Sequence, residues 1–184
     1  MYPFARLAFQ MLRHRGDPAL PLLGLHESRH LCWPWDLDVF GELNNGRTLT
    51  FYDLGRLPWS ARIGFVRVSR ERRWQVAVAG ASVRFRRRVH AFDRLAMRTR
   101  ALGWDERFLY SEQSLWLASG PFRGECASHV LIRSAVTAGR RGLVPPGEAA
   151  RLMGHEGPSP PLPPYARAWV EAEAARPWPP MGEG

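Results

Sequence analysis

The chain has 184 residues, of which 45% are hydrophobic and 11% aromatic; this is enough for one sizeable core and leaves no room for a second catalytic domain. Its formal charge at pH 7 is +9, and all its basic residues other than histidine are arginines. Such a charge suits nucleic acid, an anionic membrane or a phosphorylated small molecule. Because the sequence has neither a helix-turn-helix signal nor aromatic residues clustered on a basic face, we expect no nucleic-acid partner, and a basic nucleic-acid-binding module is the weakest alternative.

Cysteine content and hydropathy indicate the compartment. Cys32 and Cys126 are too few for a disulfide framework or a four-cysteine metal site, and no signal peptide precedes them. No run of eighteen apolar residues occurs, so we expect no transmembrane segment. These features predict a reduced, cytoplasmic protein.

An amphipathic basic helix is predicted over residues 4–15 and a loop over residues 16–24. The apolar positions of the helix recur at helical spacing, and its arginines lie elsewhere. We expect the apolar face to pack on the domain; the alternative is peripheral contact with an anionic membrane. That face comprises Phe4, Leu7, Ala8, Met11 and Leu12.

The sequence HESRH, from His26 to His30, matches a zinc-protease pattern that requires both histidines on one face of a helix. Here the surrounding residues alternate as in a strand, and Pro34 follows closely. We therefore predict the first strand at this position and no metal site.

The most informative stretch runs from Trp33 to Arg56. Asp36 and Asp38 lie one residue apart, and a polar turn then leads to Asn44 and Asn45, which are typical of a helix start. The segment that follows is apolar on nearly all sides, which indicates a buried helix, and Pro58 is expected to limit or kink its far end.

This stretch resembles the signature of the hotdog-fold acyl-CoA thioesterases of the 4-hydroxybenzoyl-CoA thioesterase type, D-x-D-x-x-G-H-x-N-N-x-x-Y-x-x-x-x-[ED]-x-x-R. Glu42 stands where that family usually has histidine, and Thr48 stands where it has tyrosine. The resemblance covers roughly the middle two-thirds of the chain. The matching residues are Asp36, Asp38, Gly41, Asn44, Asn45, Asp53 and Arg56.

Four further strands are predicted at about residues 74–89, 94–103, 108–118 and 123–137, separated by turn residues. Short connections make neighbouring strands antiparallel. The predicted fold is therefore α+β, a five-stranded antiparallel sheet wrapped around a central helix, with extra N- and C-terminal helices. It agrees with the hotdog fold that the resemblance implies. The predicted organisation is residues 1–24 as helix and loop, 25–138 as the hotdog domain, and 139–184 as a Pro-rich extension with a helix near 165–176.

The resemblance implies hydrolysis of an acyl-coenzyme A thioester, with coenzyme A as part of the substrate and no separate cofactor. Asp38 matches the catalytic carboxylate, as nucleophile or general base. Backbone N–H groups of Asn45 and Gly46 would polarise the thioester oxygen. Glu42 is a further catalytic candidate, at the position where the family has a histidine that supplies a proton transfer or a hydrogen bond.

Substrate contacts are expected from two groups of residues. Asp36 and Asn44 are candidates, although turn formation and capping explain them equally well. Arg84, Arg86 and Arg88 alternate along one predicted strand face and would bind the phosphates of coenzyme A, or else form a solvated face. In the next hairpin, Glu112 is expected at an exposed strand position.

The resemblance also implies a homodimer or a dimer of dimers with active sites at the subunit interface. A non-catalytic acyl-thioester or lipid-binding protein on the same fold is the main alternative function.

Overall fold

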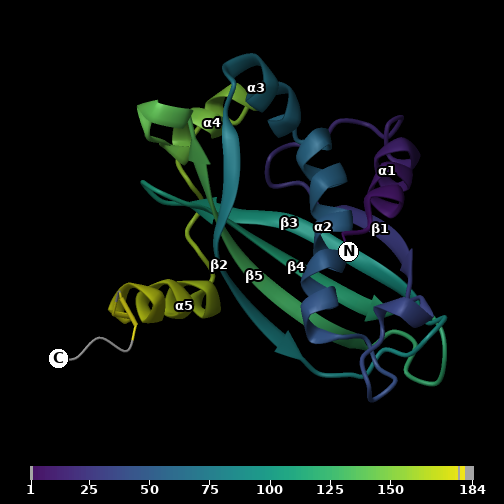
Figure 1. The fold of residues 1–184 in the computed structure, drawn as a ribbon. Coiled ribbons are helices and arrows are strands. Elements are labelled where there is room, and N and C mark those ends of the chain that lie inside the picture. Colours follow the sequence, from purple (N-terminus) through teal and green to yellow (C-terminus); the bar gives the residue numbers. More distant parts are fainter. Residues whose placement is uncertain (1, 178, 181–184) are drawn as a thin grey trace.

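The computed structural model describes residues 2–177 and 179–180 and shows a curved sheet wrapped around one long helix (Figure 1). The strands are β1 (His26–Leu31), β2 (Gln75–Phe85), β3 (Arg94–Trp104), β4 (Leu109–Leu117), β5 (Cys126–Thr137) and β6 (Leu143–Val144). The α-helices are α1 (Phe4–Arg13), α2 (Asn45–Arg62), α3 (Phe65–Arg72), α4 (Pro146–Leu152) and α5 (Pro164–Ala175), and the short 3-10 helices are η1 (Pro34–Asp36) and η2 (Gly139–Arg141).

The sheet is antiparallel throughout, with the strand order β1-β3-β4-β5-β2 and the short β6 paired with β5. This confirms the predicted α+β hotdog architecture, and the main strands begin and end within a few residues of their predicted bounds. Strand β2 is at one edge although it comes second in the chain, so its second edge has no partner strand among the described residues.

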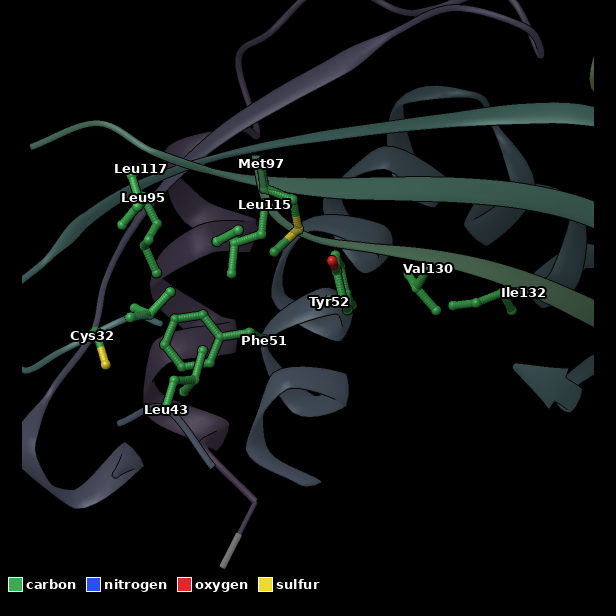
Figure 2. Close-up of a cluster of buried hydrophobic side chains, with 12 residues drawn as sticks. Cys32, Leu43, Phe51, Tyr52, Leu95, Met97, Leu115, Leu117, Val130 and Ile132 are labelled. Carbon is green, nitrogen blue, oxygen red and sulfur yellow. The ribbon is translucent and has the colours of Figure 1, made fainter. Parts of the chain in front are cut away.

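Helix α2 crosses the inner face of the sheet and forms the centre of the core (Figure 2). Phe51 and Tyr52 are at most 2% exposed and pack against Met97 of β3 and Leu115 of β4. At Gly55 the helix backbone comes so close to the sheet that an added Cβ would clash with the Met97 sulfur. Because Met97 is fully buried, a larger residue at this position would force its side chain to shift within the packed core.

The helix α2 does not end at its proline. Pro58 lies inside the helix, which continues to Arg62. Trp59 and Ile63 beyond it are each 3% exposed in the second half of the core. Burial of these side chains compensates for the backbone hydrogen bond that proline cannot donate, so Pro58 itself does not end the helix. The alternative, a kink at Pro58, stays a prediction.

Helix α1 packs on the domain as expected, but not through the expected face. Arg6 and Gln10 point toward the protein, whereas Phe4 and Leu12 are 71% and 68% exposed. The predicted burial of the whole apolar face is therefore wrong: polar contacts to the 29–36 segment determine the rotation of this helix.

The residues after 138 add to the sheet and cover its outer face. β6 pairs with β5, and Ala149 and Ala150 of α4 join the core next to α3. Helix α5 buries Ala166 against Leu102 and Tyr110 on the outer side of the sheet (Figure 1). Periodicity alone did not predict α3, α4 or β6. None of the helices in the described ranges has the length and apolar character needed to cross a membrane.

Candidate functional site

A tight turn just before α2 holds the carboxylate of Asp38. Leu37 and Leu43 form an antiparallel bridge, and the Asp38 N–H donates to the Glu42 carbonyl at 2.8 Å. Asp38 Oδ1 accepts from the backbone N–H of Phe40 at 2.8 Å and from that of Glu42 at 3.4 Å. One carboxylate oxygen is therefore held by the turn, while Oδ2 has no hydrogen bond among the described residues.

Asn44 caps α2, as its position in the sequence predicts. Its Oδ1 accepts from the N–H groups of Gly46 and Arg47 at 2.9 and 3.1 Å. The Asn45 N–H, at the first helical position, has no hydrogen-bond acceptor among the described residues. The helix dipole gives this terminus a partial positive charge, so Asn45 supplies the donor that remains open there.

A cavity of about 270 Å³ lies between the start of α2 and the segment after β2. Glu42 and Asn45 line one side, and Arg86 and Arg88 line the other. Arg88 forms an ion pair with Glu42, with its Nε 3.2 Å from Oε2. These four residues come from two separate segments of the chain, and each was a site candidate from the sequence. The structure brings them together around one cavity.

The third arginine of the predicted face lies elsewhere. β2 ends at Phe85, and the N–H groups of Arg86 and Arg87 both donate to the Ala127 carbonyl, which breaks the alternation. Arg84 instead lines a separate cavity with His129 of β5. The prediction that Arg84, Arg86 and Arg88 share one strand face is wrong, because the strand does not extend to Arg88.

Asp36 is fully buried. Its Oδ2 accepts from Arg6 at 2.7 Å and from the Trp33 N–H at 3.0 Å, and its Oδ1 accepts from Arg47 at 3.1 Å. These contacts tie α1 and the start of α2 to the loop between them. In this geometry Asp36 anchors the site and is enclosed away from any substrate.

A second, more apolar cavity of about 440 Å³ lies between the second half of α2 and strands β2, β4 and β5. Leu57, Ile63 and Val78 contribute apolar surface, and Asp53 and Arg56 line the same cavity. Arg56 forms a short ion pair with Asp53, and burial lowers its pKa even though the nearby carboxylate opposes this shift. Asp53 and Arg56 match the [ED]-x-x-R part of the family signature, which is the signal for this pair, but no role was predicted for them from the sequence.

Comparison with known proteins identifies the family. The model of the thioesterase-like superfamily matches residues 32–170. The chain belongs to this superfamily.

Relatives of this thioesterase-like chain include the THEM6 proteins of Xenopus laevis and Drosophila melanogaster. They are 32% identical over 111 and 93 residues, which make up 60% and 50% of this chain and 54% and 48% of the relatives. The chain thus spans about half the length of the curated relatives it matches.

Solved structures show the same fold at low sequence identity. The probable thioesterase YbaW from Escherichia coli superposes with a TM-score of 0.63 at 16% identity, covering 70% of this chain and 95% of that one. A 1,4-dihydroxy-2-naphthoyl-CoA thioesterase from Synechocystis superposes with a TM-score of 0.59 at 14% identity, covering 72% and 100%. These similarities establish the hotdog fold of this thioesterase-like protein.

The histidines of HESRH lie on a strand, as predicted. His26 and His30 are both buried on one face of β1, four residues apart, so their Cα atoms are separated by about 13 Å. Burial lowers their pKa values to about 4 and about 3. His30 bonds to Ser28 Oγ at 2.8 Å, and His26 Nδ1 accepts from Arg62 at 2.9 Å. Both imidazoles are neutral packing residues of the sheet, too far apart to bind one ion.

Glu112 is not at an exposed strand position; that prediction is wrong. Its side chain lies on the outer face of the sheet, beneath α5, and is 13% exposed. His129 lies 3.0 Å away, and the Tyr165 hydroxyl and Arg100 donate to it at 2.8 and 2.7 Å. Burial alone would raise the pKa of Glu112, but the hydrogen bonds from His129, Tyr165 and Arg100 outweigh it and lower the pKa to about 2. The cluster joins α5 to the sheet.

Proposed function

We propose that this chain is an acyl-coenzyme A thioesterase in which Asp38 attacks the thioester or activates water. The observation that carries the proposal is the carboxylate of Asp38, held at Oδ1 by the turn that leads into the Asn44 cap and the open N-terminus of α2. Its Oδ1 is fixed by the turn, so Oδ2 has a defined direction without a competing partner among the described residues. A carboxylate oriented in this way can serve as nucleophile or general base.

The developing negative charge on the thioester oxygen needs a donor that is already in place. The Asn45 N–H meets this requirement better than that of Gly46, which donates to the Asn44 cap. One preorganised donor of this kind typically contributes ~10²- to 10³-fold in rate. Glu42, paired with Arg88, occupies the position of the family histidine and positions the arginine rather than transferring a proton.

Substrate binding is proposed to divide between the two cavities. Arg86 and Arg88, at the cavity beside the helix start, suit the phosphates of coenzyme A, because guanidinium groups bind phosphate with paired donors. The more apolar cavity of about 440 Å³ suits the acyl group. Asp53 and Arg56 would then contact a polar part of the acyl group.

A homodimer is proposed through the free edge of β2. Val76 and Val78 on this strand are 51% and 52% exposed, and a long open strand edge is a ready site for pairing with a second copy. Pairing there would bring the partner chain close to both cavities, which β2 and the segment after it line. Gel filtration with light scattering tests this proposal. The cytoplasmic location stays a prediction.

The decisive experiment measures hydrolysis of short, long and aromatic acyl-CoAs by the wild type and by Asp38→Asn. We expect turnover to fall by at least ~10²-fold, because the near-isosteric amide removes the charge alone. Glu71→Gln, an exposed carboxylate on α3, is the matched control and should keep full activity. Equal turnover by a folded Asp38→Asn variant would refute the assignment. Acyl-CoA binding without turnover by the wild type would instead favour the non-catalytic binding protein.

A further inference from the structure

Helix α1 turns polar side chains toward the protein. Arg6 donates to the buried carboxylate of Asp36 at 2.7 Å, and Gln10 donates to the Arg29 carbonyl at 3.0 Å. Gln10 is the buried residue of this helix, at 5% exposed. These polar contacts fix which side of α1 faces the sheet, so the helix cannot rotate to bury its apolar side without breaking them.

The opposite side of α1 presents apolar side chains to solvent. Phe4, Phe9 and Leu12 are 71%, 57% and 68% exposed. On a helical wheel they follow one another around the outward arc, together with Ala5 and Ala8, which are also exposed. An ordinary surface helix buries its apolar stripe. This one leaves a continuous stripe uncovered within the described part of the chain.

A basic groove of about 870 Å³ runs beside this stripe, between α1 and the edge strand β1. Phe9 lies on its wall, and besides Arg6, which is paired with Asp36, four further arginines line it: Arg13, Arg29, Arg94 and Arg123. Within residues 2–177 and 179–180, none of these four has a carboxylate at ion-pair distance. These arginines lie beside the apolar stripe. A partner for this surface must therefore supply both negative charge and an apolar environment.

We propose that the apolar stripe of α1 and the adjacent arginine groove form a docking surface for an anionic phospholipid membrane. The stripe would enter the boundary between headgroups and acyl chains, while the arginines bind lipid phosphates. Strands β1 and β2 lie at opposite edges of the sheet, and α1 lies on the β1 side (Figure 1). The groove shares no lining residue with the two proposed substrate cavities, so the inference does not depend on the proposed thioesterase activity.

Other occupants fit less well. A second copy of the chain, docked by twofold symmetry, would bring the two sets of four arginines against each other. A small phosphate-bearing ligand in the groove would leave Phe4 and Leu12 exposed. An anionic bilayer satisfies both the cations and the apolar side chains, and its extended surface matches a helix that lies flat.

The test is co-sedimentation of the full chain with two kinds of vesicle, phosphatidylcholine alone and phosphatidylcholine mixed with phosphatidylglycerol. We expect binding only to the mixed vesicles. Phe9→Gln with Leu12→Gln, and separately Arg29→Gln with Arg123→Gln, should each weaken it at least ~10-fold. Circular dichroism should show all variants folded, because these side chains are not in the core. Hydrolysis of soluble acyl-CoA should be unchanged.

Matched controls distinguish binding of vesicles through this surface from a general effect of the protein's positive charge or apolar surface. Arg151→Gln with Arg167→Gln removes the same charge from α4 and α5, and Leu143→Gln removes a leucine that is 46% exposed on β6. Both should bind the mixed vesicles as the wild type does. The proposal is overturned if the wild type does not sediment with mixed vesicles, or if the controls lose as much binding as the surface variants. Self-association that the α1 variants abolish, without vesicle binding, would assign the surface to a second copy instead.

Discussion

Glu112 gives the sharpest prediction about stability. Its carboxylate is nearly enclosed between the sheet and α5, and it accepts hydrogen bonds from Tyr165 and Arg100 besides its contact with His129. The pKa of about 2, against an ordinary value of 4.5, corresponds to about 3 kcal/mol at neutral pH. Because Arg100 is half exposed, solvent screening reduces the expected contribution to about 2–3 kcal/mol.

The sign follows from proton binding. The unfolded chain takes up a proton at Glu112 near pH 4.5, whereas the folded chain does so only near pH 2. The stabilisation is therefore complete above about pH 4.5 and is lost as the pH falls toward 2. Glu112→Gln should lower the free energy of unfolding by about 2–3 kcal/mol at pH 7, and the difference from the wild type should shrink steadily below pH 4.5.

Urea denaturation followed by tryptophan fluorescence, at several pH values from 7 down to 3, measures this difference directly. Glu173→Gln is a suitable comparison, since Glu173 also holds α5 to the sheet, through Arg133 at 3.0 Å, but lies outside the Glu112 cluster. If Glu112→Gln changed the unfolding free energy by less than ~0.5 kcal/mol at pH 7, or if its effect did not depend on pH, the reasoning would be refuted.

Four further outcomes are expected. Asp36→Asn should destabilise the fold by about 2–3 kcal/mol in urea, because two arginines lose a buried carboxylate; a change below ~0.5 kcal/mol would contradict the anchor role. Gly55→Leu should cost about 1–3 kcal/mol by overpacking, and a thermal midpoint equal to that of the wild type would count against it. Arg86→Gln with Arg88→Gln should raise KM for acyl-CoA more than for the matching acyl-pantetheine, and equal effects would return both arginines to a surface role. Prolonged chelation should leave hydrolysis unchanged. A metal mechanism would be reinstated if the protein held stoichiometric zinc whose removal stops turnover, or if His26→Ala lost both the zinc and the turnover.

Local patterns in the sequence determined most of the architecture. Strand alternation from His26 onward and turn residues between the later strands predict the main sheet, because period and turn chemistry act over a few residues. The Asn44 cap and the turn at Asp38 are likewise local, since each is closed by backbone groups within four residues. The apolar residues on nearly all sides of the next segment predict the buried central helix, and the family signature agrees with that prediction.

Only tertiary contacts decided how side chains from separate segments meet. The face that α1 turns toward the protein depends on the bond between Arg6 and Asp36, thirty residues away. The hydrophobic pattern alone therefore indicated the wrong buried face. Glu112 is enclosed because Tyr165 arrives from α5, 53 residues later. Arg84 and Arg88 line different cavities because β2 ends at Phe85, where the Ala127 carbonyl accepts hydrogen bonds from the N–H groups of Arg86 and Arg87. Each of these outcomes depends on a pairing between distant residues, and spacing within one segment carries no information about such a pairing.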